Sequence, residues 1–475
     1  MTAARMRRFL LLGKCEKINA VKFQVERTVF MQKLTFKGGI HPNDNKSATN
    51  KIPIREIAPP DLLYFPMQQH IGAPLTALVK VGDTVKMGQK LADSDSFMCA
   101  PLHASVSGKV KDIGLYLYPT GLKMPTIVVE NDGLDTPAEP LNAKSAKELS
   151  PKEIIALVRE AGIVGMGGAG FPTHVKLSPP PEKKITHIIL NGAECEPYLT
   201  SDHRVMMETP DEVLSGLSAV MKIFSLDRAY VGIEDNKPEA IAAMKNAAKQ
   251  TPGIEILTLA KKYPQGAEKQ LIKAVTGREV PSGGLPADVG CLVINVDTAA
   301  EISRAVNKGT PLMKRVVTVA GGAIKNPANF LVRIGTPFRY VIEQAGGLTE
   351  EPKKIVMGGP MMGIAGYSLD VPVVKGTSGI LAFTESEVSV RSESNCIRCG
   401  KCVQVCPMNL LPTALNSYAL HRDWDKCAEY NILDCIECGS CSYTCPAQRH
   451  LVQSIRWGKQ QLHMKRAKEK AKAKA

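Results

Sequence analysis

The middle third of the chain alternates short apolar runs with stretches that repeat apolar residues every three or four positions. Four apolar runs of strand length occur, at 185–190, 229–233, 254–259 and 292–296. Three helical patterns alternate with them, at 238–248, 268–275 and 298–306. A further helix is predicted to begin at Pro151, within a capping box of Ser150 and Glu153, and to end at Gly162. This alternation predicts βαβ units on a mainly parallel sheet.

A region of short strands precedes this part of the chain. Residues 70–112 consist of brief apolar runs broken by Gly and Asp turns, and they resemble the barrel-sandwich fold of biotinyl and lipoyl carrier domains. Carriers of that fold need a lysine at a hairpin tip. The corresponding stretch, 93–99, contains none, so we predict a structural or docking module without carrier function.

A second small module follows the alternating region. Residues 316–375 begin with a strand pattern, and a helix is expected after a cap at Thr336-Pro337. Gly346 and Gly347 are expected to end that helix. A strand, a helix and a further strand within this length predict a β-grasp module.

Two copies of one cysteine pattern lie near the C-terminal end. Residues 396–407 and 435–446 both read C-x₂-C-x₂-C-x₃-C-P, and they hold eight of the 13 cysteines. Disulfides or zinc would suit a single C-x₂-C pair, but two full matches that include both Cys-Pro pairs favour four-iron clusters. In this pattern three cysteines bind one cluster and the fourth binds the other. The predicted ligand sets are Cys396, Cys399, Cys402 and Cys445 for the first centre, and Cys406, Cys435, Cys438 and Cys441 for the second.

The linker between the two motifs is long for a compact hairpin ferredoxin. It spans 28 residues from Cys406 to Cys435 and carries a helical pattern. We therefore predict an α-helical two-cluster domain. Cys427 lies in this linker outside both motifs and is interpreted as a packed thiol.

Length and composition fit a soluble protein of three or four domains. The chain has 475 residues, 44% of them hydrophobic, and no apolar run approaches the ~20 residues of a membrane-spanning helix. Thiolates that bind iron must stay reduced, so a reducing compartment is expected.

The net charge of +14 is concentrated at the two ends of the chain. Residues 1–37 and 451–475 each carry a net charge of +7, so the residues between them are neutral overall. This distribution argues against a nucleic-acid-binding face. Residues 1–30 are expected to be a low-order extension ahead of a natural start at Met31. The tail from Lys465 is interpreted either as a solubilising tail or as a contact with an anionic membrane surface.

A glycine-rich stretch stands between the first predicted helix and the first strand of the sheet. Gly165, Gly167, Gly168 and Gly170 form a G-x-G-x-x-G pattern, but a helix precedes it where a dinucleotide site requires a strand. One interpretation is a turn that packs helix on sheet. The other is a loop whose amides surround a phosphate or a flat ring, with Lys176 supplying positive charge.

Three further stretches lie where predicted strands end or helices begin, at 191–197, 263–270 and 295–298. Asn191, Glu194 and Glu196 belong to the first stretch; its acids are either solvated loop residues or groups that face ribose hydroxyls or a flavin edge. The second stretch contains Gly266 and Glu268. Asn295 and Thr298 of the third are expected to donate to a phosphate or to ring carbonyls.

The chemistry of the clusters suggests a flavin. Four-iron clusters pass electrons singly, whereas NADH gives two electrons at once as a hydride, and a flavin converts between the two. A chain with two clusters and a glycine-rich α/β domain is therefore interpreted as an electron path. It would begin at a site for the electron donor, continue through a flavin and end in the two clusters.

Together these stretches resemble the flavin- and NADH-binding subunit of respiratory complex I. That resemblance implies that the glycine-rich loop, Asn191 and the turn of Asn295 and Thr298 hold FMN, and that the acids face NADH. The cofactor-binding residues that it implies are Gly165, Gly167, Gly168, Gly170, Lys176, Asn191, Glu196, Gly266, Glu268, Asn295 and Thr298. It also implies that Glu194 and Glu268 are acids on the NADH side. The sequence departs from the family at Met166, where Arg is usual, at Gly192-Ala193, and at Ala267, where Glu is usual. These departures bear on the implied NADH contacts more than on the implied FMN contacts.

From Met31 onward the whole chain resembles the family of C subunits of the Rnf (Rsx) electron-transport complex. Further matches are 35–42 and 358–363. The resemblance implies a peripheral subunit on the cytoplasmic face of the inner membrane. It also implies that this subunit is the NADH-linked oxidoreductase of an ion-translocating complex, a translocase. The implied partners are ferredoxin and the other subunits of the complex, which are membrane-embedded or carry flavin. No nucleic-acid partner is expected. Two alternatives stay open, a soluble protein like the cobalamin reductases and a non-catalytic ferredoxin-docking wire. The A subunit of the Na⁺-translocating quinone reductase lacks these cysteines and fits less well.

The predicted fold class is multidomain α/β and α+β. It combines a barrel-sandwich module, a Rossmann-like FMN/NADH domain, a β-grasp (SLBB) module and an α-helical two-[4Fe–4S] ferredoxin domain. The predicted boundaries are 31–135 for the barrel-sandwich module, 136–312 for the FMN/NADH domain, 313–385 for the β-grasp module and 386–455 for the ferredoxin domain. The extension covers 1–30 and the basic tail 456–475.

Overall fold

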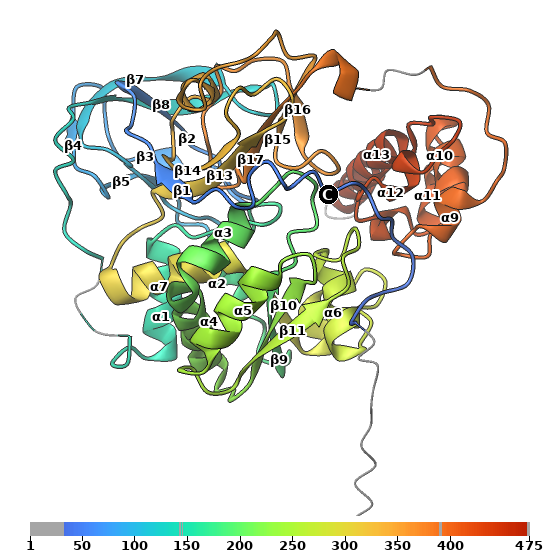
Figure 1. Cartoon of the computed structure of the whole chain (residues 1–475), viewed down its shortest axis with the longest axis horizontal. Helices are drawn as coiled ribbons and strands as arrows, with labels where there is room; N and C mark the ends of the chain where they lie inside the picture. Colours follow the sequence, from blue (N-terminus) through green and yellow to red (C-terminus); the bar gives the residue numbers. More distant parts are fainter. Residues whose placement is uncertain (1–32, 142–143, 145, 389–391, 473–475) are drawn as a thin grey trace, which may run out of the picture. The chain divides into compact units, whose positions relative to one another are not determined.

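A computed structural model describes residues 33–472, apart from 142–143, 145 and 389–391. The predicted extension 1–30 and the start at Met31 lie outside the described residues. From Leu34 onward the chain forms one unit of mutual contacts, and all the elements below belong to it (Figure 1).

The barrel-sandwich region consists of two small antiparallel sheets, with strand orders β2-β8-β7-β4 and β3-β5-β6. Its strands are β2 (Leu62–Pro66), β3 (Thr76–Ala77), β4 (Thr84–Val85), β5 (Lys90–Asp93), β6 (Leu102–His103), β7 (Gly108–Leu117) and β8 (Lys123–Asn131). The predicted short strands are thus confirmed. The segment 93–99, where a carrier lysine would stand, joins β5 to β6. It packs through Asp93 against Arg159 of helix α1 (Pro151–Glu160), with 3.2 Å between Oδ1 and Nη2.

The middle region has a four-stranded, all-parallel sheet, as predicted, with the order β11-β10-β9-β12. Its strands are β9 (His187–Gly192), β10 (Ala229–Glu234), β11 (Ile254–Leu259) and β12 (Cys291–Asn295). Its helices are α1 (Pro151–Glu160), α2 (Thr173–Lys176), α3 (Ser201–Glu208), α4 (Pro210–Phe224), α5 (Pro238–Ala248), α6 (Glu268–Thr276) and α7 (Val296–Lys308). The predicted capping box is present at α1, where Ser150 and Glu153 bond each other's backbone amides.

The predicted boundary between the last strand and helix of this region is wrong. Asn295 ends β12 and its side chain accepts the amides of Asp297 and Thr298, so α7 begins at Val296. Helices α3 and α4, which lie between β9 and β10, were not predicted. Helix α4 crosses α7 closely at Gly216, where a Cβ would lie 1.7 Å from the carbonyl oxygen of Ala299.

The predicted β-grasp module forms most of a six-stranded sheet with the order β1-β14-β13-β17-β15-β16. Its elements are β13 (Lys314–Ala320), β14 (Ala328–Arg333), α8 (Phe338–Gln344), β15 (Lys354–Met357), β16 (Ile364–Gly366) and β17 (Gly379–Phe383). Strand β1 (Ile54–Glu56) comes from the N-terminal region and pairs with β14. The cap falls within the predicted pair Thr336-Pro337: Pro337 is the N-cap, and the Thr336 hydroxyl is buried with no hydrogen-bond partner among the described residues.

The ferredoxin-type region is helical, as predicted. Its helices are α9 (Lys401–Gln404), α10 (Pro412–Leu420), α11 (Trp424–Glu429), α12 (Ser440–Tyr443) and α13 (Leu451–Lys472). Cys427 is fully buried among them, which agrees with the packed-thiol interpretation. Helix α13 runs through the predicted boundary at residue 455, and its Leu462 is buried in the same apolar core. The first part of the predicted basic tail is therefore packed protein.

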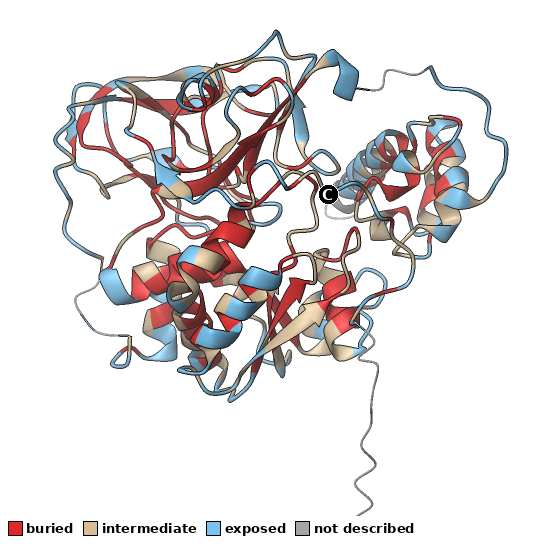
Figure 2. Ribbon diagram, in the orientation of Figure 1, coloured by how far each residue is buried: buried red, intermediate tan, exposed pale blue. Residues whose placement is uncertain are grey.

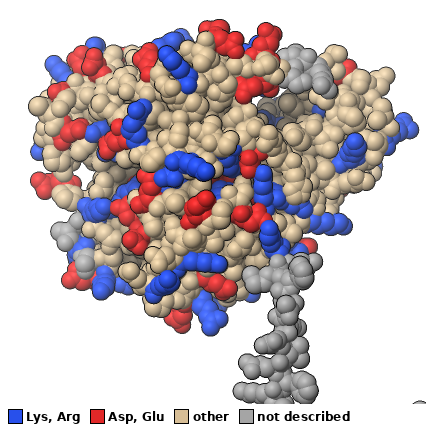
Figure 3. All heavy atoms as spheres, viewed as in Figure 1, with Lys and Arg blue, Asp and Glu red and all other residues tan. Residues whose placement is uncertain are grey.

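Burial and charge follow the layers of the fold. Figure 2 shows buried residues along the sheets and on the helix faces that cover them. On the face in Figure 3, Lys and Arg are interspersed with Asp and Glu. Among the described helices, none combines the length and the apolar content needed to span a bilayer.

Candidate flavin and iron–sulfur sites

The glycine-rich loop joins α1 to α2 and closes on itself. The amide of Gly165 donates to the carbonyl of Phe171 (2.8 Å), and Gly170 has a φ of +69°. A Cβ on Gly167 would lie 2.7 Å from Nδ2 of Asn295, so this position requires glycine. A Cβ on Gly168 would meet nothing within 4 Å, and Gly167 to Ala169 are exposed. The loop therefore presents an open backbone surface beside the start of α7.

The first turn of α7 holds this loop in place. The Met166 amide donates to the Thr298 hydroxyl (3.1 Å). Asn295 caps the helix with Oδ1 and donates through Nδ2 to the carboxylate of Asp202 (2.7 Å). Thr298 and Asn295 thus lie directly beneath the glycine-rich loop.

The loop after β9 carries the other predicted residues. Asn191 donates through Nδ2 to the Gly266 carbonyl (2.8 Å), which brings 191–197 and 263–270 together. The Glu194 side chain is 3% exposed. Its carboxylate accepts the Asp202 amide (2.7 Å) and lies 3.6 Å from Nζ of Lys46. Glu194 is therefore a buried loop acid and not a solvated one.

The Glu196 carboxylate is hydrogen-bonded to the turn between β15 and β16. Its two carboxylate oxygens accept the amides of Met361 (3.0 Å) and Met362 (2.9 Å). Burial raises its pKa, and these amide donors oppose that shift. A Cβ on Gly359 would lie 2.2 Å from Oε2 of Glu196. The carboxylate thus joins the middle region to the β-grasp module, and the structure does not bring it to the glycine-rich loop.

Lys176 and Glu268 form a pair at the start of α6. Nζ of Lys176 lies 2.6 Å from Oε1 of Glu268 and donates to the Val293 carbonyl (2.7 Å). Both side chains are about one-third exposed, at 33% and 38%. An exposed pair of this kind is weak enough to exchange for a phosphate or a ribose.

Sequence reasoning missed Asp202, which lies between two predicted residues. Burial raises its pKa to about 7, and the carboxylates of Glu194 and Asp297 act in the same direction. Its position in α3 had no sequence signal, because that helix was not predicted.

The residues at this site fit FMN. A flat ring or a phosphate needs exposed backbone amides without side chains in the way, and the glycine-rich loop supplies them. The N-terminus of the 13-residue helix α7 and the Asn295 amide add positive dipoles beside it.

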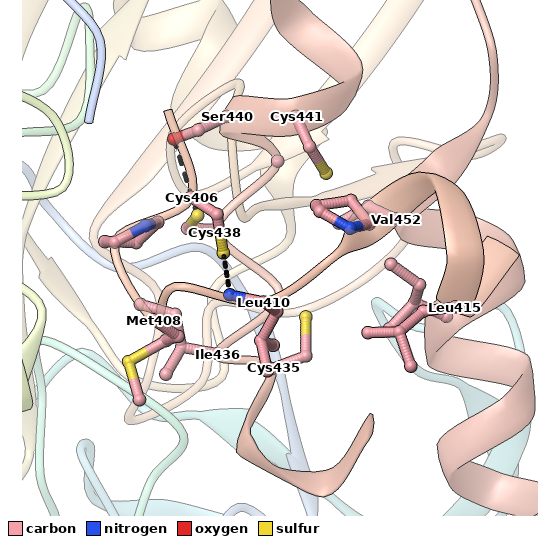
Figure 4. Close-up of a pocket in the computed structure, with 14 residues that line it drawn as sticks. Cys406, Met408, Leu410, Leu415, Cys435, Ile436, Cys438, Ser440, Cys441 and Val452 are labelled. Carbon is pink, nitrogen blue, oxygen red and sulfur yellow. Dashed lines mark hydrogen bonds between the residues drawn. The ribbon is translucent and has the colours of Figure 1, made fainter. Parts of the chain in front are cut away.

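Four cysteines of the second predicted centre surround one pocket. Cys406 comes from the first motif, and Cys435, Cys438 and Cys441 come from the second (Figure 4). The amide of Leu410 donates to Sγ of Cys406 (3.4 Å), and the amide of Glu437 donates to Sγ of Cys435 (3.4 Å). Amide donors of this kind stabilise thiolates that bind iron.

The first predicted centre is more exposed. Cys402 and Cys445 pack against the same apolar residues, Leu451 and Val452. Cys396 and Cys399 lie on an exposed loop before α9. The structure thus brings a cysteine of the second motif, Cys445, to the first motif.

The two motifs repeat the same backbone. Arg398 and Glu437 have φ values of +54° and +57°, and Gly400 and Gly439 have +73° and +78°. Each glycine precedes a one-turn helix, α9 or α12. Matching left-handed residues at matching positions give both loops the same curvature around their three cysteines.

Burial raises the pKa of Cys435 to about 11 and that of Cys441 to about 12. Thiols in such surroundings stay protonated until a cation takes the place of the proton, so cluster binding here would release protons. Among the described residues, no three His, Cys, Asp or Glu side chains are close enough to hold a single metal ion. A four-iron cluster does not require that, because each thiolate binds a different iron atom.

Comparisons with known proteins agree with this architecture. Four family models match: the RnfC barrel sandwich hybrid domain at 34–134, the Nuo51 FMN-binding domain at 158–304, the SLBB domain at 316–365 and the 4Fe-4S dicluster domain at 395–449. The predicted fold class, with its FMN and two-cluster domains, is confirmed.

Curated relatives match along most of their length. The C subunit of a proton-translocating ferredoxin:NAD(+) oxidoreductase complex from Clostridium ljungdahlii is 55% identical, over 92% of this chain and 96% of its own. The C subunit of the Na(+)-translocating complex from Acetobacterium woodii is 49% identical, over 91% and 98%. The C subunit of an ion-translocating oxidoreductase complex from Rhodobacter capsulatus is 43% identical, over 92% and 85%. The chain is a flavo-iron–sulfur protein by domain content. It belongs to the RnfC family.

Proposed function

We propose that this chain passes electrons between NAD(H) and ferredoxin, as the C subunit of an ion-translocating complex, through FMN and two [4Fe–4S] clusters. One observation carries the proposal. The hydroxyl of Tyr263 donates to the carbonyl of Cys438 (2.8 Å), a residue of the second centre. The candidate flavin site and the second cluster site therefore meet through a direct contact.

The packing around this contact is continuous. Cys195, from the loop after β9, packs in one apolar cluster with Tyr263 and Cys438. The amide of Gly266 donates to Sγ of Cys195 (3.4 Å). Gly266 also receives the Asn191 hydrogen bond, so the path leads from the candidate flavin loops to the second centre without a gap.

The order of the carriers follows from exposure. The second centre faces the flavin domain through Tyr263, whereas Cys396 and Cys399 of the first centre are exposed. Electrons that leave FMN would enter at the second centre and leave the protein at the first. That exposed end supports a redox partner docking beside Cys396.

When bound, FMN would take a hydride from NADH and release its electrons singly. The loop amides and Asn295 bind and orient the flavin. Of the two predicted NADH-side acids, Glu268 is the more accessible, because the Glu194 side chain is only 3% exposed beside Lys46. Nicotinamide-nucleotide binding would thus displace Lys176 from Glu268.

The location and partners of this chain are part of the proposal. The relatives are subunits of ion-translocating complexes, and no described helix is able to span a bilayer. A peripheral position on the cytoplasmic face of the inner membrane is consistent with both, with ferredoxin and membrane-embedded, flavin-bearing subunits as partners.

The test is an anaerobic preparation assayed for iron, sulfide and flavin and then titrated with NADH. We expect two four-iron clusters and one FMN per chain, with NADH bleaching both the flavin and the cluster absorbance. Protein with intact clusters that binds no flavin and does not respond to NADH would instead be a ferredoxin-docking wire, and the proposal would fail.

A further inference from the structure

A segment at the start of the barrel-sandwich module, ahead of its strands, lies against both candidate sites. We call residues 34–50 the N-terminal strap. Ile40 and Tyr263 exchange amide hydrogen bonds (2.8 and 2.9 Å), and the Gly39 amide donates to the carbonyl of Val405 (2.8 Å). A Cβ on Gly38 would lie 2.8 Å from the carbonyl oxygen of Cys406. The strap thus contacts a ligand loop of the second centre.

The strap then inserts a lysine into the loop after β9. Lys46 is 5% exposed. Its Nζ donates to the carbonyls of Glu194 (2.9 Å) and Glu196 (2.9 Å), and also to that of Leu199. One ammonium group therefore has three carbonyl acceptors within six residues of chain, and the loop wraps around it.

The wrapped loop has an uncommon backbone. Glu194 has a φ of +45° and Tyr198 has a φ of +66°. Non-glycine residues adopt this left-handed region only when their surroundings impose it, and such residues are concentrated at functional sites. The strap imposes it here, because Lys46 holds the Glu194 carbonyl and the Asp44 carbonyl accepts the Tyr198 amide (2.7 Å).

Burying an ammonium is unfavourable, and burial lowers the pKa of Lys46. The Glu194 carboxylate, 3.6 Å away, opposes that shift. Simple apolar packing would fill this space at lower cost. The geometry, with every acceptor on one loop, indicates a group that shapes that loop.

A chain of contacts leads from this loop to the glycine-rich loop. Glu194 accepts the Asp202 amide (2.7 Å), and the Asp202 carboxylate accepts Nδ2 of Asn295 (2.7 Å). Nδ2 of Asn295 lies against Gly167. A change at Lys46 is therefore passed to the surface that the flavin would occupy.

We infer that Lys46 is a positioning residue, which fixes the loop 194–199 so that the flavin site is formed and stays aligned with the second cluster. This inference rests on the proposed function. Lys46 contacts no reacting atom; it acts through Glu194, Asp202 and Asn295.

The test compares Lys46→Met with Lys51→Met in the full chain. Lys51 lies just beyond the strap and is exposed, so it is a matched control. FMN affinity is measured by quenching of flavin fluorescence, and hydrogen exchange is followed in peptides covering 193–199. We expect the FMN dissociation constant to rise at least tenfold in Lys46→Met, with faster exchange in that loop. Lys51→Met should match the wild type, and both variants should keep the EPR signals of both clusters.

A second variant covers the case in which Lys46→Met does not fold. Lys46→Arg keeps the charge, but a planar guanidinium is unable to serve three carbonyls around one point, so a smaller loss of affinity is expected. A folded Lys46 variant that binds FMN as tightly as the wild type, with unchanged exchange, would overturn the inference. Failure of the wild type itself to bind FMN would instead defeat the proposed function.

Discussion

At the scale of single residues, Cys406 has the most informative position. It stands in the first motif, yet it lines one pocket with three cysteines of the second (Figure 4). Cys445 of the second motif packs with Cys402 of the first. This crossed arrangement ties the two motifs together through both centres.

Replacing Cys406 should therefore remove the centre built on the other motif. In Cys406→Ala we expect the EPR signal of the centre held by Cys435, Cys438 and Cys441 to disappear. The centre built on Cys396 should keep its signal, because none of its ligands is altered. Loss of that signal instead, with the other retained, would contradict the assignment.

Asp202 gives the site a dependence on pH. Its pKa in the folded protein is about 7, against an ordinary value of 3.8, because it is buried near Glu194 and Asp297. Between pH 3.8 and about 7 the folded state therefore holds a proton that the unfolded chain has released. The stability that Asp202 contributes falls as the pH rises across this range and is lost above about pH 7.

Asp202→Asn removes that titration and keeps an oxygen that can accept from Asn295. Relative to the variant, the wild type should lose stability between pH 5 and pH 7, by at most about 1.4 kcal/mol per pH unit. Anaerobic urea denaturation at several pH values measures the difference. Parallel pH profiles for the two proteins would show that Asp202 is ionised throughout.

At the scale of elements, the sequence predicted what local patterns determine. The capping box at α1, the three helical patterns of the middle region and its parallel strands all occur in the structure. Helix α7 begins earlier than predicted because the cap is Asn295 and not a residue nearer Thr298. The pairing of β1 with β14 joins residues far apart in sequence, so no local pattern predicts it.

The residues of the candidate sites also fall into two groups, those in local sequence motifs and those whose partners are distant in sequence. The cluster cysteines and the glycine-rich loop are contiguous motifs, and they stood out in the sequence. Lys46 is 148 positions from Glu194, and Asp202 is 93 positions from Asn295, so neither carries a local signal. For Glu196, the sequence identified the residue, but its amide donors come from the β-grasp module 165 positions away.

Helix α13 shows how charge patterning misleads at this scale. Its many lysines indicated a tail, but Leu462 is 3% exposed within the core that contains Leu415 and Ala419. A helix is able to carry basic residues on one face while burying the other.

Leu462→Ala should therefore destabilise the ferredoxin-type region by about 2–5 kcal/mol, the usual cost of a buried leucine. Met464 is 53% exposed, so Met464→Ala is the matched control and should have little effect. The stability of each variant is measured by the loss of cluster absorbance in anaerobic urea titrations. Equal urea midpoints for the two variants would mean that Leu462 is not packed in this core and belongs to a tail.

At the scale of the whole molecule, the modules are joined by single polar side chains. Glu196 ties the flavin domain to the β15–β16 turn. A second such residue is Lys375 of the β-grasp module. It is 1% exposed, and its Nζ donates to the carbonyls of Pro101 (2.5 Å) and Gly162 (2.7 Å). It therefore connects the barrel-sandwich module and the end of α1.

Burial lowers the pKa of Lys375 to about 7, from an ordinary value of 10.5. Between these two values the unfolded chain holds a proton that the folded protein lacks, so stability should rise with pH. Lys375→Met lacks this titration. The difference in melting temperature, wild type minus variant, should therefore grow from pH 7 to pH 9 in anaerobic calorimetry. A constant difference would mean that Lys375 stays charged between the modules, held by its two carbonyls and by the carboxylate of Asp93.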